Sequence, residues 1–277
     1  MILTHNVIDL IIYFSKLQSQ MAAFLCNEQN CRQNTLRAAE NGHLECLRYA
    51  HNLLGASCEW HPRTTYTAAQ NGYLECLRYA HENGCEWAPD TTFIAAMNGH
   101  LECLRYSHEN GCPWHPKTTY AAAANGQLEC LKYAHENGCE WHPETTYWAA
   151  QFGQLECLRY AHENGCEWHP NTTCGAAANG ELECLRYAHE SPGVSCVWDP
   201  RTIYFAAREK QLECLMYIYE HCGDVATWEN ANLEDETGMV SKKFPKKIRH
   251  YIDSVRDDWK CGLNSPGARI KSARRNC

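Results

Sequence analysis

Residues 117–143 read KTTYAAAANGQLECLKYAHENGCEWHP, and the same pattern returns along most of the chain. The copies that begin at Arg63, Asp90, Lys117 and Glu144 each span 27 residues, so the pattern recurs with a fixed period. Longer or decayed copies begin near residues 33, 171 and 201, and the tripeptide LEC occurs in all seven copies. A fixed period of this size indicates a repeat architecture, and we place seven repeats over residues 33–228.

Each repeat carries signals for two short helices. In residues 118–124, a threonine can cap the helix start, alanines favour helix, and the Asn-Gly that follows ends it. Residues 128–136, LECLKYAHE, place apolar side chains on one broad arc and Glu129, Lys132 and Glu136 on the opposite side, with spacings that suit ion pairs. The Gly of the next Asn-Gly supplies a left-handed cap, and CxWxP is expected to be a short extended connection.

A repeat of this size cannot bury its own apolar arc, so it must stack on its neighbours. The sequence therefore predicts an all-α helical solenoid of about seven 27-residue helix-turn-helix repeats, starting near residues 33, 63, 90, 117, 144, 171 and 201.

The segment AAxNGxLECLRYAHENG resembles AAxxGHLEVVKLLLxxG, the core of the ankyrin repeat, and its Cys- and Trp-rich variety is similar to ankyrin-like proteins of giant DNA viruses and protists. These repeats open with TTYx where ankyrin repeats have TPLH, and they are shorter than the usual 33 residues. We expect short loops in place of long β-hairpin fingers. The resemblance implies a non-enzymatic scaffold that binds a partner protein on the concave face of the stack, with a viral effector acting on host proteins as one such role.

The first helix varies between repeats at its first, fifth and eighth positions. These positions are spaced i, i+4 and i+7, so they share one helical face, opposite the constant Thr and Ala positions. We predict that they form the strip that contacts the partner protein. The predicted partner-binding residues are Arg63, Gln70, Asp90, Met97, Lys117, Glu144, Trp148, Gln151, Arg201, Phe205 and Arg208.

The fifth position has two interpretations. Trp148 and Phe205 are the best candidates for hot-spot anchors if they are exposed, because aromatic side chains dominate binding energy. In ankyrin repeats the residue before Ala-Ala is a buried leucine, so both can equally be core residues. The exposure of Trp148 decides between these interpretations.

Cysteine and histidine recur as C-x4-H-x3-C-x2-H, as in residues 130–142. Cys2His2 sets bind zinc, so a zinc-binding repeat protein is an alternative function. Three observations oppose it. Cys130 and His135 lie about 140° apart on one helix, the last His is replaced by Ala88 and Asp199 in two repeats, and a free Cys packs like a small hydrophobic residue. We interpret these rows as core packing and predict no metal and no cofactor.

The repeats show no sign of catalysis. No phosphate-binding loop is present, and no Ser, Asp or Cys departs from the repeat pattern as a nucleophile would. We therefore predict that the protein is not an enzyme, has no small-molecule substrate and acts as a monomer that binds another protein.

The nineteen cysteines bear on the compartment, because disulfides persist only where the environment is oxidising. An odd number leaves a thiol unpaired, the opening MILTHNVIDLIIYF reads poorly as a signal peptide, and no stretch reaches the ~20 apolar residues of a membrane span. We expect reduced thiols in an intracellular, cytoplasmic protein, with the nucleus as an alternative. The net charge of −8 argues against nucleic-acid binding by the whole surface.

The two ends do not fit the repeat. Residues 1–32 are expected to form an N-terminal helical cap, with a degenerate F-box-like adaptor helix as the alternative. Residues 229–277 are expected to form a capping helix and a flexible basic tail, because residues 241–277 hold eleven Lys or Arg against three acidic residues. The tightest basic cluster is Lys242, Lys243, Lys246 and Lys247. The tail is either simply solvated or a tether to nucleic acid or membrane.

Overall fold

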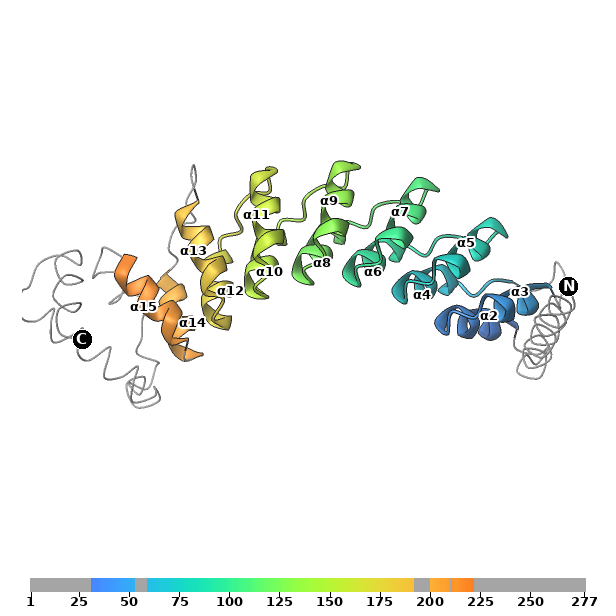
Figure 1. Ribbon diagram of the computed structural model, residues 1–277, viewed down its shortest axis with the longest axis horizontal. Coiled ribbons are helices and arrows are strands. Elements are labelled where there is room, and N and C mark those ends of the chain that lie inside the picture. Colours follow the sequence, from blue (N-terminus) through green and yellow to red (C-terminus); the bar gives the residue numbers. More distant parts are fainter. Residues whose placement is uncertain (1–30, 53–58, 192–199, 210, 222–277) are drawn as a thin grey trace, which may run out of the picture. The chain divides into compact units, whose positions relative to one another are not determined.

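In a computed structural model of the chain, the described residues are 31–52, 59–191, 200–209 and 211–221, and they form fourteen α-helices joined by turns and short loops (Figure 1). Within those ranges there is no strand, and the helices come in seven successive pairs. The predicted all-α solenoid of seven repeats is confirmed. Nearly all of the expected cap at residues 1–32, and all of residues 229–277, lie outside the described residues.

The chain divides between His142 and Pro143 into two compact units. In the first unit, the first helices of the repeats are α2 (Cys31–Glu40), α4 (Thr64–Gln70), α6 (Thr91–Met97) and α8 (Thr118–Ala124). The second helices are α3 (Leu44–Asn52), α5 (Leu74–Glu82), α7 (Leu101–Glu109) and α9 (Leu128–Glu136). Each first helix packs against the next first helix, and each second helix against the next second helix, so the unit has two helical layers.

The second unit repeats this arrangement. Its first helices are α10 (Thr145–Gln151), α12 (Thr172–Asn179) and α14 (Pro200–Arg208), and its second helices are α11 (Leu155–Glu163), α13 (Leu182–Glu190) and α15 (Leu212–His221). Helix α12 packs between α10 and α14, and α13 packs between α11 and α15. The first helices are therefore neighbours within each unit, which brings side chains 27 to 30 residues apart in sequence onto one surface.

The core of each unit lies between the two helical layers. The Ala pair of each first helix and the Leu that follows LEC are fully buried, as at Ala95, Ala96 and Leu104. The LEC cysteine is buried beside them, as at Cys103. Small alanine side chains let the first helices approach closely, and leucine fills the space towards the second helices.

Glycine ends the second helices as the sequence predicts. Gly84 follows α5 with a φ of +85°, in the left-handed region that glycine adopts without a steric penalty. The neighbouring Asn83 side chain donates a hydrogen bond to the carbonyl of Tyr79, 2.8 Å away, so a carbonyl in the last turn of the helix gains a partner. The chain then runs through a short loop to α6, and this loop stands where a long β-hairpin finger would be.

The prediction that a threonine caps each first helix is wrong. Helix α6 begins with Thr91 and Thr92 inside it, and its cap residue is Asp90, which makes no side-chain capping bond. Both threonines are fully buried. The Thr91 hydroxyl donates to the carbonyl of Ala88, 2.8 Å away. The second threonine of the pair finds its partners in the loop that leads to the next repeat instead of at its own helix end.

Thr92 Oγ1 donates a hydrogen bond to the carbonyl of Pro113 (3.2 Å) and accepts one from the backbone N–H of His115 (3.0 Å). We call this pair of bonds the threonine clamp. It recurs at Thr65, Thr119 and Thr146, each of which holds, at two backbone groups, the loop that leads to the following repeat. Those loop groups are mostly part-buried, and leaving them without partners is costly.

Aromatic and polar side chains link the second helices. The His81 ring stacks on Trp87, with 4.3 Å between centroids, and its Nδ1 is hydrogen-bonded to the hydroxyl of Tyr106 in the next repeat, 3.2 Å away. The Arg78 guanidinium lies over the same Tyr106 ring, 5.2 Å from its centroid. We call this arrangement the histidine–tyrosine ladder. The His–Tyr hydrogen bond recurs at His51, His162 and His189, so these histidines hydrogen-bond across the stack.

The tryptophans complete the ladder. The indole N–H of Trp60, Trp87 and Trp114 donates to the carbonyl of the asparagine that ends the second helix of the next repeat. Trp168 differs, because Ser191 occupies the position of that asparagine at the three-residue insertion. Its buried Nε1 has no hydrogen-bond partner among the described residues. The insertion thus interrupts the regular pattern between the sixth repeat and its predecessor.

Replacing Thr92 by Val should destabilise the protein by about 2 kcal/mol, because the isosteric side chain leaves a part-buried carbonyl and a part-buried N–H of the next loop without partners. The matched variant Thr92→Ser keeps the hydroxyl and loses one methyl group, so it should cost only about 1 kcal/mol. Urea denaturation followed by circular dichroism measures both. Equal losses for the two variants would contradict a role for the hydroxyl.

Acidification should weaken the ladder. Burial lowers the pKa of His51 and of His189 below the usual 6.5, and His221 lowers that of His189 further. Well above pH 6.5 both rings are neutral in the folded and in the unfolded chain, so their contribution to the free energy of unfolding is complete. As the pH falls through 6.5 towards the lower folded pKa, the unfolded chain binds the proton more readily than the folded one. The contribution to stability is lost over this range. The double variant His51→Gln, His189→Gln should show a smaller loss of thermal stability between pH 7.5 and 5.5 than the wild-type chain. His43→Gln, at an exposed turn histidine, is the control.

Candidate functional site

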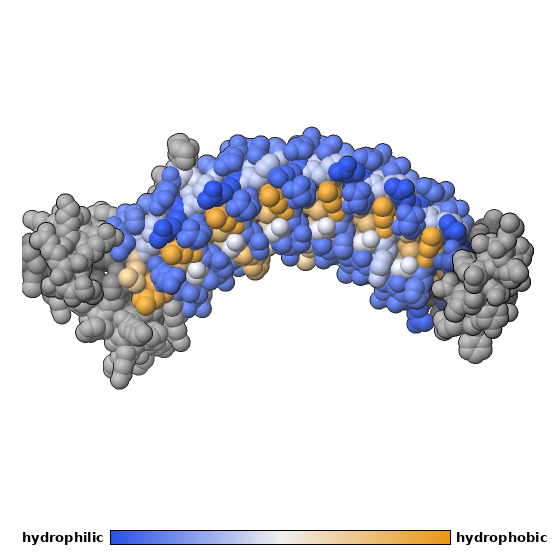
Figure 2. Space-filling model, viewed as in Figure 1, coloured by the Kyte–Doolittle hydropathy of each residue, from blue (hydrophilic) through white to orange (hydrophobic). Residues whose placement is uncertain are grey.

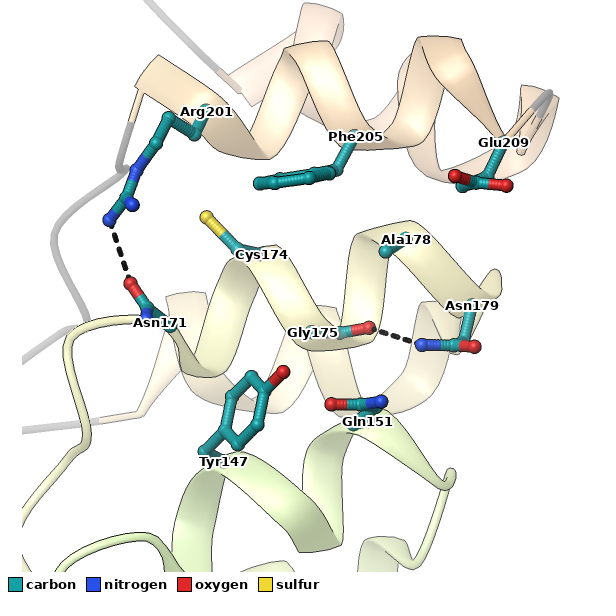
Figure 3. Close-up of a pocket in the computed structure, with 10 residues that line it drawn as sticks. All are labelled: Tyr147, Gln151, Asn171, Cys174, Gly175, Ala178, Asn179, Arg201, Phe205 and Glu209. Carbon is teal, nitrogen blue, oxygen red and sulfur yellow. Dashed lines mark hydrogen bonds between the residues drawn. The ribbon is translucent and has the colours of Figure 1, made fainter.

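A groove of about 350 Å³ opens on the first helices of the second unit (Figure 3). Its walls come from α10, α12 and α14. The lining residues are Tyr147, Gln151, Asn171, Cys174, Gly175, Ala178, Asn179, Arg201, Phe205 and Glu209.

Helical periodicity explains which side chains reach the groove. Arg201, Phe205 and Glu209 are spaced four residues apart, so they line one face along α14 and the residue after it. Asn171, Gly175 and Asn179 have the same spacing on α12 and its cap. Tyr147 and Gln151 extend the arrangement onto α10 (Figure 3). Three neighbouring first helices thus place side chains from one face of each helix on the same surface.

Gly175 forms the floor of the groove. A Cβ atom at this position would lie 2.9 Å from the ring of Tyr147 and 3.3 Å from Cβ of Gln151, so a side chain here would press against α10. In the other repeats this position holds larger side chains such as Ile94 and Trp148. Glycine leaves the floor of the groove without a side chain.

Polar groups in the groove are partly paired. The Arg201 guanidinium donates to Asn171 Oδ1 at 2.8 Å, and Asn179 Nδ2 donates to the carbonyl of Gly175 at 3.1 Å (Figure 3). The thiol of Cys174 lies 3.3 Å from the hydroxyl of Thr202. Gln151 Oε1 is buried and has no hydrogen-bond partner among the described residues. The lining thus offers amide, aromatic and charged groups, which are groups suited to binding a polypeptide.

Comparison with known proteins identifies the repeat. Residues 93–135 match the family model described as ankyrin repeats (many copies). The chain contains ankyrin repeats. Its structure is also similar to the crystal structure of the human ASB11 ankyrin repeat domain, with a TM-score of 0.53 and 18% sequence identity over 66% of this chain and 96% of that one. No curated protein sequence matches the chain.

The first position of the ankyrin-repeat helices is exposed. Arg63, Asp90, Lys117, Glu144 and Arg201 all reach solvent. Local contacts hold some of them, such as the Asp90 carboxylate, 3.4 Å from Nε2 of His115. These residues are therefore accessible to a partner, and their role in binding remains a prediction.

The fifth position is mostly core. Thr67, Ile94, Ala121 and Gly175 are buried, which fits the interpretation of this position as packing. Trp148 is half-buried: its Nε1 donates to Glu144 Oε2 at 3.1 Å, and its ring stacks on Phe152 with 5.6 Å between centroids. Phe205 is also half-buried and lies in the groove. The two aromatic residues therefore combine a packed side with an accessible one.

At the eighth position, the exposure of the side chain differs from repeat to repeat. Gln70 and Met97 are exposed, Gln151 is half-buried and Ala124 is buried. The side chain of Arg208 lies outside the described part of the structure, as do Lys242, Lys243, Lys246 and Lys247. Of the predicted partner-binding residues, Gln151, Arg201 and Phe205 line the groove. The predicted residues of the first unit lie on or next to the first helices of that unit and are not part of the groove.

Sequence comparison missed several lining residues. Tyr147 occupies an almost constant tyrosine position, so nothing in the repeats marks it. Asn179 and Glu209 lie just beyond the variable positions considered. Phe152, 49% exposed, replaces the asparagine of Asn-Gly and was a signal that sequence comparison could have used. Over the described ranges, large exposed hydrophobic residues are few, and Figure 2 shows hydrophobic residues only as small patches on mainly hydrophilic surfaces.

The cysteine and histidine rows do not converge. Among the described residues, no group of three or more His, Cys, Asp or Glu is placed to hold a metal ion. Cys130 is buried in the core, whereas His135 stacks on Trp141, with 4.4 Å between centroids. Burial raises the pKa of Cys130 to about 11, which disfavours the thiolate that zinc requires.

No helix of the described residues is long and apolar enough to cross a membrane.

The buried thiols should react slowly. Burial raises the pKa of Cys76 and Cys130 to about 11 and of Cys103 and Cys184 to about 12, so all four are protonated at pH 8 and shielded from reagents. We expect iodoacetamide at pH 8 to alkylate them at least about tenfold more slowly in native than in urea-denatured protein. Mass mapping of peptides over time measures each site. Native rates equal to denatured rates would show that these cysteines are accessible.

Proposed function

We propose that this ankyrin-repeat protein is a non-enzymatic scaffold that binds a partner protein through the first-helix face of its second unit, with the groove at Gly175 as the centre of the contact. Ankyrin repeats generally mediate protein–protein interaction. The observation that carries the proposal is the groove itself, because it brings variable positions of three neighbouring first helices together on one surface.

The groove has the size and chemistry of an anchor site. A volume of about 350 Å³ accommodates one or two side chains. Phe205 offers an aromatic wall, and such aromatic residues carry much of the binding energy at protein interfaces. A stable interface buries about 1,200 Å² or more, so the contact must extend beyond the groove. The Trp148–Phe152 aromatic pair on α10 is a second apolar contact for a partner in the same unit.

The alternative functions have less support. The zinc hypothesis needs ligands that converge, and the described cysteines and histidines do not. Tethering through the basic tail concerns residues outside the described part of the structure and stays a prediction, as does a role as a viral effector acting on host proteins. We further propose that the protein acts as a monomer inside the cell; its twelve described cysteines are all free thiols, and such thiols persist in a reducing compartment.

Affinity capture with matched variants tests the binding face. Phe205→Ala removes the aromatic wall, and Gly175→Leu fills the groove. We expect each variant to reduce recovery of a partner captured by the wild-type chain by about tenfold or more, which corresponds to the loss of one hot-spot side chain.

Met216→Ala is the control, because Met216 is exposed on the second helix α15 of the same unit, away from the first helices. It should leave recovery unchanged. Circular dichroism must show that every variant is folded. A partner that binds Phe205→Ala and Gly175→Leu as strongly as the wild type would refute this face as the binding surface.

A further inference from the structure

One wall of the groove carries opposite charges at its two ends. Along α14, Arg201 is an exposed cation, Phe205 is a half-buried aromatic side chain, and Glu209 is an exposed anion. Each step is four residues, which corresponds to about 6 Å along a helix axis. The wall therefore presents a cation, an aromatic ring and an anion in a row of about 12 Å.

The helix itself reinforces this order. Arg201 lies in the first turn of α14, where the partial charge of the helix dipole is positive, and Glu209 follows its last residue, where that charge is negative. At the Arg201 end, the side-chain charge and the helix dipole both favour an anionic group of a ligand. At the Glu209 end, the side-chain charge and the dipole both favour a cationic group. Arg201 has five N–H donors, so it can donate to a carboxylate of the ligand while it keeps its hydrogen bond to Asn171.

The middle of the groove suits an apolar side chain. Gly175 lies on α12 between the rings of Tyr147 and Phe205 (Figure 3). Because this floor has no side chain, one apolar group can enter against the Phe205 ring. The amides of Asn171, Gln151 and Asn179 lie around it, and side-chain amides can pair with both the N–H and the C=O groups of a peptide backbone.

The spacing fits an extended chain. In a strand, alternate side chains point to the same face, about 6.6 to 6.8 Å apart. Residues i, i+2 and i+4 of an extended peptide therefore match the three positions of α14 to within about 2 Å over the whole row. A helical ligand would match the row only with residues four apart.

We propose that the groove binds an extended segment of the partner protein in which an acidic and a basic residue stand four apart with an apolar residue midway. The acidic side chain pairs with Arg201, the apolar side chain enters over Gly175 against Phe205, and the basic side chain pairs with Glu209. The peptide can run in either direction along α14, since the arrangement specifies only its three side chains. The inference rests on the proposed function and adds the chemistry of the partner.

Selection from a displayed library of random nine-residue peptides tests the pattern on the full-length protein. The wild-type chain should enrich sequences with one acidic and one basic residue at i and i+4 and an apolar residue at i+2. Arg201→Glu gives the groove two anions and should enrich peptides with two basic residues; Glu209→Lys should enrich peptides with two acidic residues. Because these predictions use total charge, they hold for both peptide directions.

Three defined probes quantify the effect: GSETLTKSG, with mixed charges, GSETLTESG and GSKTLTKSG. Fluorescence polarisation should show that the wild-type chain prefers the mixed probe by about tenfold, as expected when surface ion pairs are replaced by like charges. Arg201→Glu should instead prefer the doubly basic probe. Arg37→Glu, at an exposed arginine on the first helix α2 of the other unit, is the matched control and should behave as the wild type.

The outcomes separate this inference from the proposed function. Enriched peptides that lose binding to Phe205→Ala but share no charge pattern would overturn the inference and leave the binding face intact. The same enriched sequences from the wild type and from both charge variants would also overturn it. If no peptide is enriched, and the captured partner also binds Phe205→Ala, both the inference and the proposed function fail.

Discussion

The packing of successive repeats depends on one buried hydroxyl, which recurs in four repeats. The second threonine of the first helix donates to one backbone carbonyl and accepts from one N–H in the loop that leads to the next repeat, as Thr92 does with Pro113 and His115. A loop as short as CxWxP has few backbone groups that it can pair within itself. The clamp gives two of them partners and fixes the next repeat at the same time. This explains why Thr-Thr recurs while neighbouring positions vary.

The two helical layers differ in how strongly contacts between repeats constrain their side chains. The second helices carry the histidine–tyrosine ladder, in which stacked rings, hydrogen bonds and Arg–Tyr contacts join each repeat to the next. This layer is nearly identical from repeat to repeat because most of its side chains contact a partner one repeat away. The first helices pack through alanines and leave their outer positions unconstrained. Variation is tolerated there, and the groove at Gly175 lies among these variable positions.

Some features of the candidate site could be read from the repeats and others could not. Variation at the first, fifth and eighth positions located Gln151, Arg201 and Phe205, since residues with that spacing share a helix face. Tyr147 escaped this approach, because a constant residue can line a groove once its neighbour is reduced to glycine. Glu209 and Asn179 escaped it because they follow the variable positions at the helix ends. Gly175 was visible in the sequence, yet its meaning depends on what lies opposite.

The sequence by itself determined the period, the two helices of each repeat, the solenoid and the turns at Asn-Gly, because these follow from local propensity and from the need to bury one apolar arc per repeat. Only the tertiary structure decided the role of the threonines, which bond to the loop before the next repeat instead of capping their own helices, and the assembly of the groove from α10, α12 and α14. Both depend on contacts between residues more than 20 positions apart, whose geometry no local pattern encodes.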